Sequence, residues 1–350
     1  RSVVADHPCD LRNLVLAVLQ KKRRPLGFDA HKIQSIFPKI KLIQKNRLQQ
    51  IVVDPENDVF SSAYNCLLSK DGKKLIKVCK NSDVSELTSL ELLDVQKCKL
   101  QSLDVTKNLA LTSLACNNNE LITLDVANNT SLVKFYCSDN KLTRINITAN
   151  TALKELDVAD NLLSVLNIRN NAALTYLCVS NNADIAMVDV KLNTALEVLV
   201  ASGLAITDVD LTANTALKGV ELFNENLTTS NIPATTRIGY VFERKTPYSK
   251  GKMMSVNVTS RKWNEAKTWC TSFAGWYLPS IDELSQIYNN KSVIDSVLSA
   301  YGYATLFNES SEFYWSSTDG KVSGRRKMSF WDGEIVDGNM NFHSLVRAVL

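Results

Sequence analysis

The sequence predicts a multi-domain protein, with a mainly β solenoid of about seven turns between an N-terminal cap and an α+β C-terminal domain. Leucine recurs in steps of twenty-one residues, with one step of twenty-two, at positions 90, 111, 132, 153, 174, 196 and 217. This period stops at about Asn231, and all five tryptophans, at 263, 269, 276, 315 and 331, lie beyond it. We therefore expect a cap over residues 1–84, a solenoid over residues 85–231 and a separate domain over residues 236–350.

Each repeat places apolar residues at the same six offsets from its first leucine. In one repeat these are Leu111, Leu114, Cys116, Leu121, Leu124 and Val126. The last three residues of Leu-x-x-Leu-x-Cys alternate between inside and outside, as a short strand does. The return leg carries β-branched residues with Asn and Asp instead of a helical stripe, so we expect both legs to be extended. Such turns bury their apolar edges only by stacking on one another, which favours a binding surface over a pocket.

Two polar columns accompany the apolar ones. Asparagine stands eighteen residues after the first leucine at Asn108, Asn129, Asn150, Asn171, Asn193 and Asn214. Fourteen residues after it stand Asp104, Asp125, Asn146, Asn167, Asp189 and Asp210. Such side chains bond nearby backbone groups, so we expect them to satisfy the corners of the turns. The alternative is a row of oxygen ligands for cations such as calcium.

The N-terminal cap is expected to contain helices followed by a hairpin. Asp10–Gln20 has the apolar spacing of an amphipathic helix that starts from an Asp cap. Residues 67–76 read as a hairpin, because Asp71-Gly72 supplies the turn between two apolar runs. The first fifty residues are locally basic, but a net charge of +4 does not argue for nucleic acid. With no run of eighteen apolar residues and no leader-like segment, the chain is typical of a trimmed, mature-length protein without a membrane span.

Cysteine and histidine form no catalytic or metal-binding pattern, which predicts a protein without enzymatic activity or cofactor. The three histidines, His7, His31 and His343, are far apart, and no His-Glu-x-x-His or Gly-x-Ser-x-Gly motif is present. Cys116 and Cys137 occupy one inward column, where side chains point the same way, so we expect buried free thiols.

The repeat Leu-x-x-Leu-x-Cys-x-x-Asn-x-Leu resembles the leucine-rich repeats of bacterial surface proteins, including the twenty-one-residue, cysteine-containing type of internalin relatives. The stretch from Ile51 to Ile76 is similar to repeats of Treponema and Bacteroides surface antigens. These resemblances imply a secreted or surface-exposed bacterial protein that binds other molecules.

Residues 236–350 carry four spaced motifs that resemble the C-terminal domain of a collagen-like bacterial adhesin. The motifs are Trp263-x-x-Ala266-x-x-x-Cys270, Gly275–Leu284, Tyr314–Thr318 and Val346–Val349. The resemblance implies a divergent C-type-lectin-like fold. We expect strands over residues 238–242 and 253–258, and helices over residues 261–273 and 280–289, the second with a Ser280–Glu283 capping box. The calcium-ligand triplets of true lectins are missing, so calcium is the one cofactor left open.

Two surfaces are candidates for binding a ligand. The first strand of the repeats should present outward a mixed-charge strip suited to a host or matrix protein, from Lys134, Tyr136, Lys154, Glu155, Asp157, Tyr176 and Glu197, with Lys218 and Glu221 continuing it. The C-terminal domain should present a loop suited to a glycan, formed by Trp331, Asp332, Glu334, Asn339 and Asn341. The sequence thus predicts a protein adhesin, with a carbohydrate-binding protein or a structural spacer as alternatives.

Overall fold

The structure is a computed structural model. It describes residues 40–45, 47–53, 60–63, 66–69, 71–73, 75–78, 84–243, 251–256, 259–303, 305–306, 313–319, 325–338, 340 and 344–350. The helix expected over Asp10–Gln20 lies outside these residues. The chain forms two compact units, residues 1–173 and residues 174–350, which are described in turn.

The first unit begins with two small antiparallel sheets. They are formed by β1 (Ile40–Lys45) with β2 (Arg47–Val53), and by β3 (Phe60–Ala63), β4 (Cys66–Ser69) and β5 (Leu75–Val78). Strands β4 and β5 form the hairpin expected over residues 67–76. Gly72 has φ 73°, a conformation that glycine adopts without the steric cost of a Cβ atom. Its N–H donates to the Ser69 carbonyl at 2.9 Å, which closes the turn.

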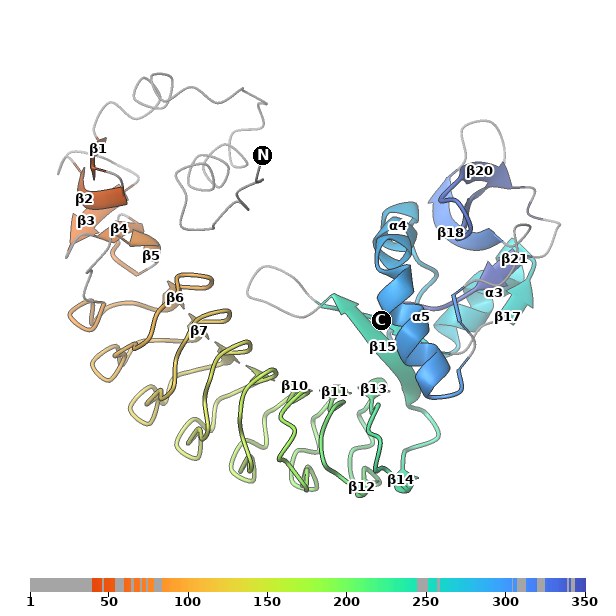
Figure 1. The fold of residues 1–350 in the computed structure, drawn as a ribbon, viewed down its shortest axis with the longest axis horizontal. Helices are drawn as coiled ribbons and strands as arrows, with labels where there is room; N and C mark the ends of the chain where they lie inside the picture. Colours follow the sequence, from red (N-terminus) through yellow and green to blue (C-terminus); the bar gives the residue numbers. More distant parts are fainter. Residues whose placement is uncertain are drawn as a thin grey trace. The chain divides into compact units, whose positions relative to one another are not determined.

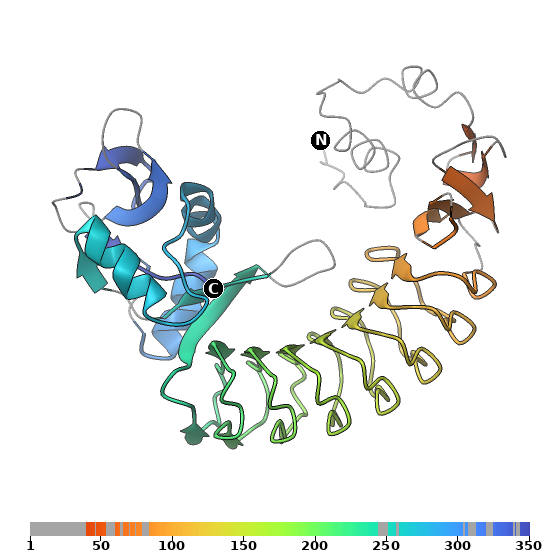
Figure 2. The same ribbon diagram turned by 180° about the vertical axis from the view of Figure 1, so that it is seen from behind.

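Four parallel strands follow, one in each turn of the solenoid. They are β6 (Leu92–Asp94), β7 (Ser113–Ala115), β8 (Lys134–Tyr136) and β9 (Glu155–Asp157). The central residues Leu93, Leu114, Phe135 and Leu156 stand in register, and none of them is exposed to solvent. Figures 1 and 2 show these turns from two opposite sides as loops that each carry a short strand. The expected apolar column is therefore continuous through this unit.

Both predicted polar columns stabilise the turns. The Asn129 amide donates to the carbonyls of Val105 and Asn108 in the preceding turn, at 2.9 Å each, and Asn150 repeats the arrangement. At the other column, the Asp125 carboxylate accepts the N–H of Ala127 at 2.9 Å, which is the local bond of an Asx turn. The structural interpretation of both columns is confirmed.

A third asparagine column was not recognised as a ladder from the sequence. Asn119, Asn140 and Asn161 each follow a residue in the left-handed region, namely Asn118 (φ 56°), Asp139 (φ 53°) and Asp160 (φ 49°). The Asn140 amide oxygen accepts the N–H of Leu121 at 3.0 Å, and its amide N–H groups donate to the carbonyls of Cys116 and Cys137. Asn and Asp tolerate the left-handed conformation better than most residues, which explains their place where each strand ends.

The second unit continues the same repeat and then changes. Strands β10 (Tyr176–Cys178), β11 (Val198–Val200), β13 (Gly219–Glu221) and β15 (Arg237–Glu243) pair in parallel, and β16 (Lys252–Ser255) pairs antiparallel with β15. Together with the first unit, the chain forms a β-solenoid of about seven turns.

The expectation of a second strand in every return leg is wrong for most of the turns. Among the described residues, return legs form strands only in β12 (Asp208–Asp210) and β14 (Thr229–Asn231), which pair with each other. Elsewhere single bonds link successive return legs, such as Lys141 N–H to the Leu121 carbonyl at 2.9 Å. Asx side chains accept backbone N–H groups along these legs, but Asp210 of β12 does so too, so these bonds alone do not exclude a ladder.

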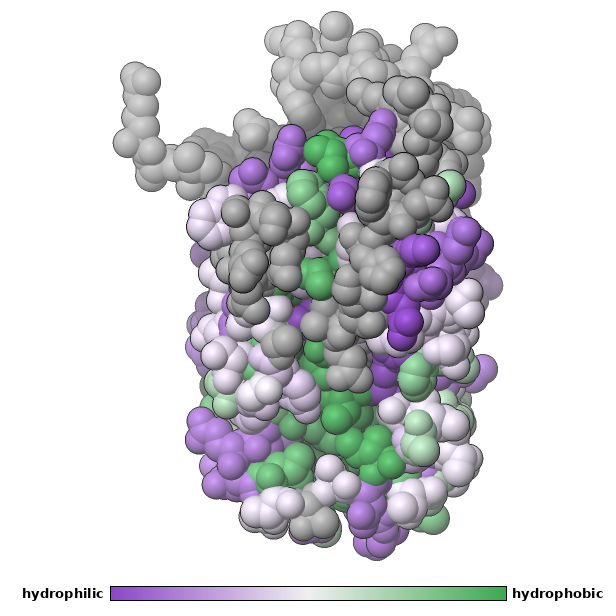
Figure 3. Space-filling model, turned by 90° about the vertical axis from the view of Figure 1, so that its right-hand side faces the viewer, coloured by the Kyte–Doolittle hydropathy of each residue, from purple (hydrophilic) through white to green (hydrophobic). Residues whose placement is uncertain are grey.

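Residues 259–350 contain the helices of the second unit. These are α3 (Trp263–Thr271), α4 (Ile281–Asn289) and α5 (Lys291–Ala300), beside a five-stranded sheet in the order β17 (Thr259–Arg261), β21 (Ser344–Val346), β18 (Phe313–Asp319), β19 (Arg325–Ser329) and β20 (Ile335–Gly338). The two predicted helices are confirmed with slightly shorter bounds, and the Ser280–Glu283 capping box is present. Helix α5 was not predicted. On the face drawn in Figure 3, hydrophilic side chains flank a central band of hydrophobic ones.

The last solenoid turn of this unit packs directly on the segment that follows it. Phe223 contacts the rings of Tyr240 and Tyr301, with centroids 6.2 and 5.1 Å away. The indole N–H of Trp276 donates to the Lys218 carbonyl at 2.9 Å. A Cβ atom on Gly219 would lie 2.8 Å from the Met253 sulfur, so a larger residue would require this side chain to shift. The apolar end of the solenoid is therefore covered within the second unit.

Candidate binding surfaces

The strip predicted on the first strands divides into exposed and buried positions. In the first unit, Lys154 is exposed, and the side chains of Lys134 and Glu155 are 41% and 13% exposed. Tyr136 and Asp157 are completely buried. The expectation that the side chains of Tyr136 and Asp157 lie on the surface is wrong. Each is the last residue of its strand, two residues after Lys134 or Glu155, and is buried although it lies on the same side of the strand.

Charged side chains of the strip pair across successive strands. Lys134 Nζ lies 3.3 Å from the Glu155 carboxylate, and the Tyr136 hydroxyl donates to the same carboxylate. Burial, followed by this hydrogen bond, raises the pKa of Tyr136 above its ordinary value. Glu155 thus has two neighbours that fix its position, and it presents a defined acceptor beside a lysine.

In the second unit the strip is also partly buried. Tyr176 and Glu221 are both buried, which corrects their expected exposure. Glu197 is 45% exposed, and its carboxylate lies 2.8 Å from Lys218 Nζ. The strip therefore has a Lys–Glu pair in each unit, with Lys134 the more exposed partner in the first and Glu197 in the second.

The predicted loop of the C-terminal domain is a turn between β19 and β20. Trp331 is 55% exposed, and Asp332 and Glu334 are exposed beside it. The Asp332 carboxylate accepts the N–H of Glu334 at 3.0 Å, and this bond is the first cause that lowers the pKa of Asp332. Lys291 Nζ donates to the carbonyls of Phe330 and Trp331 at 2.8 and 3.3 Å, so the turn is held to α5. Asn339 and Asn341 lie outside the described residues.

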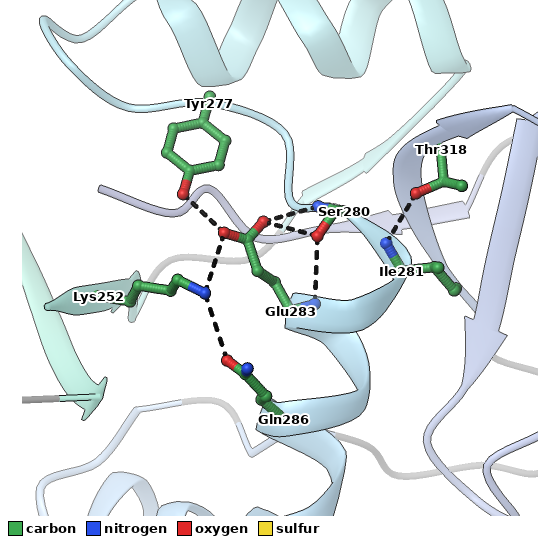
Figure 4. A network of polar contacts seen from close by, with 7 residues as sticks. All are labelled: Lys252, Tyr277, Ser280, Ile281, Glu283, Gln286 and Thr318. Atoms are coloured by element: carbon green, nitrogen blue, oxygen red, sulfur yellow. Dashed lines mark hydrogen bonds and ion pairs between the residues drawn. The ribbon is translucent and has the colours of Figure 1, made fainter. Parts of the chain in front are cut away.

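A polar network fixes the start of α4 (Figure 4). The Glu283 carboxylate accepts the Tyr277 hydroxyl at 2.8 Å and the backbone N–H of Ser280 at 2.8 Å. Lys252 Nζ lies 3.5 Å from the same carboxylate. Burial alone would raise the pKa of Glu283, but the bonds from Ser280 and Tyr277 outweigh it and leave the pKa lowered. All of these contacts position the helix, and none presents a group to a ligand.

Cys116, Cys137 and Cys270 are buried and form no disulfide bond, as expected for the first two. Cys178 is also buried, whereas Cys98 is partly exposed and its thiol donates to the Gln96 carbonyl at 3.2 Å. Burial raises the pKa of Cys270 to about 12 despite the nearby Arg237 cation. A thiol in this state has almost no thiolate at neutral pH, so Cys270 is not an activated nucleophile. The three histidines lie outside the described residues.

The Arg237 side chain marks a site that the sequence did not indicate. Its guanidinium carbon lies 3.6 Å from the ring centroid of Phe273 and 4.4 Å from that of Trp269, and Arg237 is only 3% exposed. Burial lowers its pKa. An arginine at the start of a strand gives no sequence signal for such an aromatic enclosure, because the rings lie more than thirty residues later, Trp269 in α3 and Phe273 just after it.

No helix among the described residues is both long enough and apolar enough to cross a bilayer. Among the same residues, no group of three or more His, Cys, Asp or Glu side chains is placed to hold a metal ion.

No protein-family model matches the chain, and no curated protein matches it. Among solved structures, it is similar to the functional domain of InlJ from Listeria monocytogenes, which includes a cysteine ladder, with 29% identity over 44% of this chain and 34% of that chain and a TM-score of 0.39. It is also similar to a leucine-rich repeat protein of Leptospira interrogans, with 20% identity over 45% of this chain and 46% of that chain and a TM-score of 0.39. An internalin of Listeria monocytogenes is 19% identical over 45% of this chain and 58% of that chain, with a TM-score of 0.32. Each match covers less than two thirds of the other protein.

Proposed function

We propose that the chain is a non-catalytic bacterial surface or secreted protein whose solenoid binds a host or matrix protein. The observation that carries this proposal is the pair of exposed Lys134 and partly buried Glu155 on a sheet whose inward side chains are completely buried. A rigid sheet holds these groups at fixed spacing, so little conformational entropy is lost when a partner binds. The binding residues are Lys134, Lys154 and Glu155 in the first unit and Glu197 in the second.

Charge reversal at matched positions tests this proposal. The full-length protein is measured by interferometry against immobilised fibronectin, laminin and collagen. Lys134→Glu should weaken capture about tenfold or more, as expected for a residue at the centre of an interface. The control is Lys141→Glu, because Lys141 forms the same kind of exposed pair with Glu120, at 3.5 Å, but lies on the return leg. Equal effects of the two changes, or no capture by the unaltered protein, would contradict the proposal.

A second candidate function is carbohydrate binding by the C-terminal domain, which we suppose to have the C-type-lectin-like fold. Trp331 favours it, because a 55% exposed indole on a turn held by Lys291 is suited to stacking on a sugar ring. Full-length protein and Trp331→Ala are compared on a glycan array, with and without calcium. The control is Val293→Ala, which removes another exposed apolar side chain of the same domain. A blank array together with no protein capture would favour the structural spacer.

A further inference from the structure

Arg237, the first residue of β15, is a buried cation without a hydrogen-bond partner for its side chain. It is only 3% exposed, and its Nε and Nη1 groups are fully buried with no acceptor among the described residues. The third nitrogen, Nη2, also forms no hydrogen bond within this part of the chain, but it is not among the fully buried groups. The great majority of buried polar groups in folded proteins are hydrogen-bonded, so an arginine in this state points to an acceptor from outside the chain.

Within the described part of the chain, no carboxylate pairs with Arg237. The register of β13 and β15 places Gly219, which has no side chain, opposite Arg237. Glu221, two residues further along β13, accepts the backbone N–H of Val241 at 2.5 Å. Burial lowers the pKa of Arg237, and only the Cys270 thiol opposes this shift. Since burial raises the pKa of Cys270 to about 12, that thiol is neutral and supplies no counter-charge.

Aromatic rings surround the guanidinium group but leave its hydrogen bonds unmade. The Phe273 ring centroid lies 3.6 Å from the guanidinium carbon, which is a stacking distance, and the centroids of Trp269 and Trp276 lie at 4.4 and 5.6 Å. Such ring contacts offset only part of the cost of burying a charge. The N–H groups lie in the guanidinium plane, and each of its two forks pairs Nη2 with one of the buried nitrogens. An anion that reaches Nη2 is therefore in position to accept a second hydrogen bond.

We propose that Arg237 binds the carboxylate group of an acidic sugar. A carboxylate is planar and fits in the plane of a guanidinium that is stacked on a ring, whereas a tetrahedral sulfate or phosphate would also extend toward that ring. Trp269 and Phe273 are partly exposed beside the cation, and aromatic rings suit the apolar face of a pyranose. The site is independent of the Trp331 turn and of protein binding by the solenoid strip, because it shares no residue with either.

The test titrates the full-length protein with methyl glucuronide, and with methyl glucoside as the neutral sugar of the same ring, at constant ionic strength. Intrinsic tryptophan fluorescence reports binding, because Trp269 and Trp276 lie beside the guanidinium. Arg237→Met removes the charge and keeps most of the packing on Phe273. Phe273→Leu keeps the charge and removes the stacked ring, which provides a second variant. Arg144→Met changes an exposed arginine of the first unit in the same way and is the matched control.

Methyl glucuronide should bind, and methyl glucoside should bind about tenfold more weakly or not at all, since it offers no charged acceptor. Arg237→Met should lose about tenfold or more in affinity for the glucuronide, Phe273→Leu should lose less, and Arg144→Met should change it less than about twofold. The proposal is overturned if the glucuronide does not bind, if the glucoside or inorganic sulfate binds as tightly, or if Arg237→Met and Arg144→Met bind equally. If Arg237→Met does not fold, an unchanged affinity in Phe273→Leu overturns it instead.

Discussion

The Asn129 side chain satisfies two buried carbonyls of the preceding turn, those of Val105 and Asn108. Its substitution by alanine leaves both acceptors without a donor, which should lower the free energy of unfolding by about 2–4 kcal/mol. Asn129→Asp should lower it further at neutral pH, because a carboxylate has no N–H to donate. Urea unfolding followed by circular dichroism measures both values. The adjacent Asn128, exposed and bonded only to the Thr106 carbonyl at 3.2 Å, is the control. Equal losses for Asn128→Ala and Asn129→Ala would contradict the ladder.

Arg237 gives a second prediction at the scale of one residue. Its Nε and Nη1 groups are buried and have no hydrogen-bond partner among the described residues, so its stabilising contribution comes from contact with the rings. Arg237→Ala should lower the free energy of unfolding by about 3 kcal/mol, because it leaves a cavity beside Phe273. Arg237→Met should lose less than about 1.5 kcal/mol, since it keeps the packing and removes a buried cation. Exposed Arg144→Ala serves as the control, and equal losses in the Ala and Met variants would show that charge outweighs packing.

The two tyrosines of the strip show that a sequence pattern predicts the side of a strand on which a residue lies but not its exposure. Alternation places Tyr136 and Tyr176 on the side of the strand opposite the inward residues Phe135 and Leu177. It does not report exposure, because strands about 4.8 Å apart let neighbouring side chains cover a ring completely. The two polar columns that include Asp125 and Asn129 were predictable, because their contacts repeat within each turn or from one turn to the next. Exposure at the strip depends on the sizes of several neighbours at once.

At the scale of elements, the start of α4 makes stability depend on pH. The Glu283 pKa is lowered in the folded protein, so its contribution to stability is complete above the ordinary glutamate pKa, about 4.3, and is lost as pH falls through the folded value. Glu283→Gln keeps the size of the side chain but removes the charge. The difference in unfolding free energy between the unaltered protein and Glu283→Gln should be largest near neutral pH and should shrink below about pH 4.3. Urea titrations from neutral pH to acid measure it. Asp282→Asn, in the same turn but exposed, is the control, and a difference that does not change with pH would contradict the assignment.

Elements with local signals were predicted, and elements that depend on packing were not. The capping box predicted the start of α4. Helix α5 begins directly after Asn290 and has no side-chain cap bond. Its Val293, Ile294 and Val297 are β-branched residues, which are weak helix formers. The return legs carry strand-like residues, yet among the described residues only β12 and β14 form a ladder there. Apolar runs predicted the strands near β15 and β16 and the helix near α3, but not the five strands from β17 to β21.

At the scale of the whole molecule, the junction inside residues 174–350 decides how the domains can be tested. The sequence suggested a boundary near residue 236, because the repeat ends there. In the second unit, however, β15 pairs with β13, and Trp276 donates to the Lys218 carbonyl. Long-range contacts of this kind leave no periodic signal in a sequence. A deletion at residue 236 therefore removes a neighbour of the last turn as well as a candidate ligand site.

A fragment of residues 1–236 should consequently be less stable than the solenoid in the full chain. It loses the rings that cover Phe223 and the strand that pairs with β13, so it exposes apolar surface that is now buried. We expect a lower melting temperature and increased binding of the dye ANS. Trp276→Phe in the full chain is the matched variant, since it keeps an aromatic ring but loses the hydrogen bond to Lys218 and part of the buried indole, at a cost of about 2 kcal/mol. An unchanged melting temperature in the fragment would show that the solenoid needs no cover at this end, and deletion could then locate the ligand site. If the melting temperature of the fragment is lowered, its loss of ligand capture cannot be assigned to the missing domain. The point variants must then locate the ligand site.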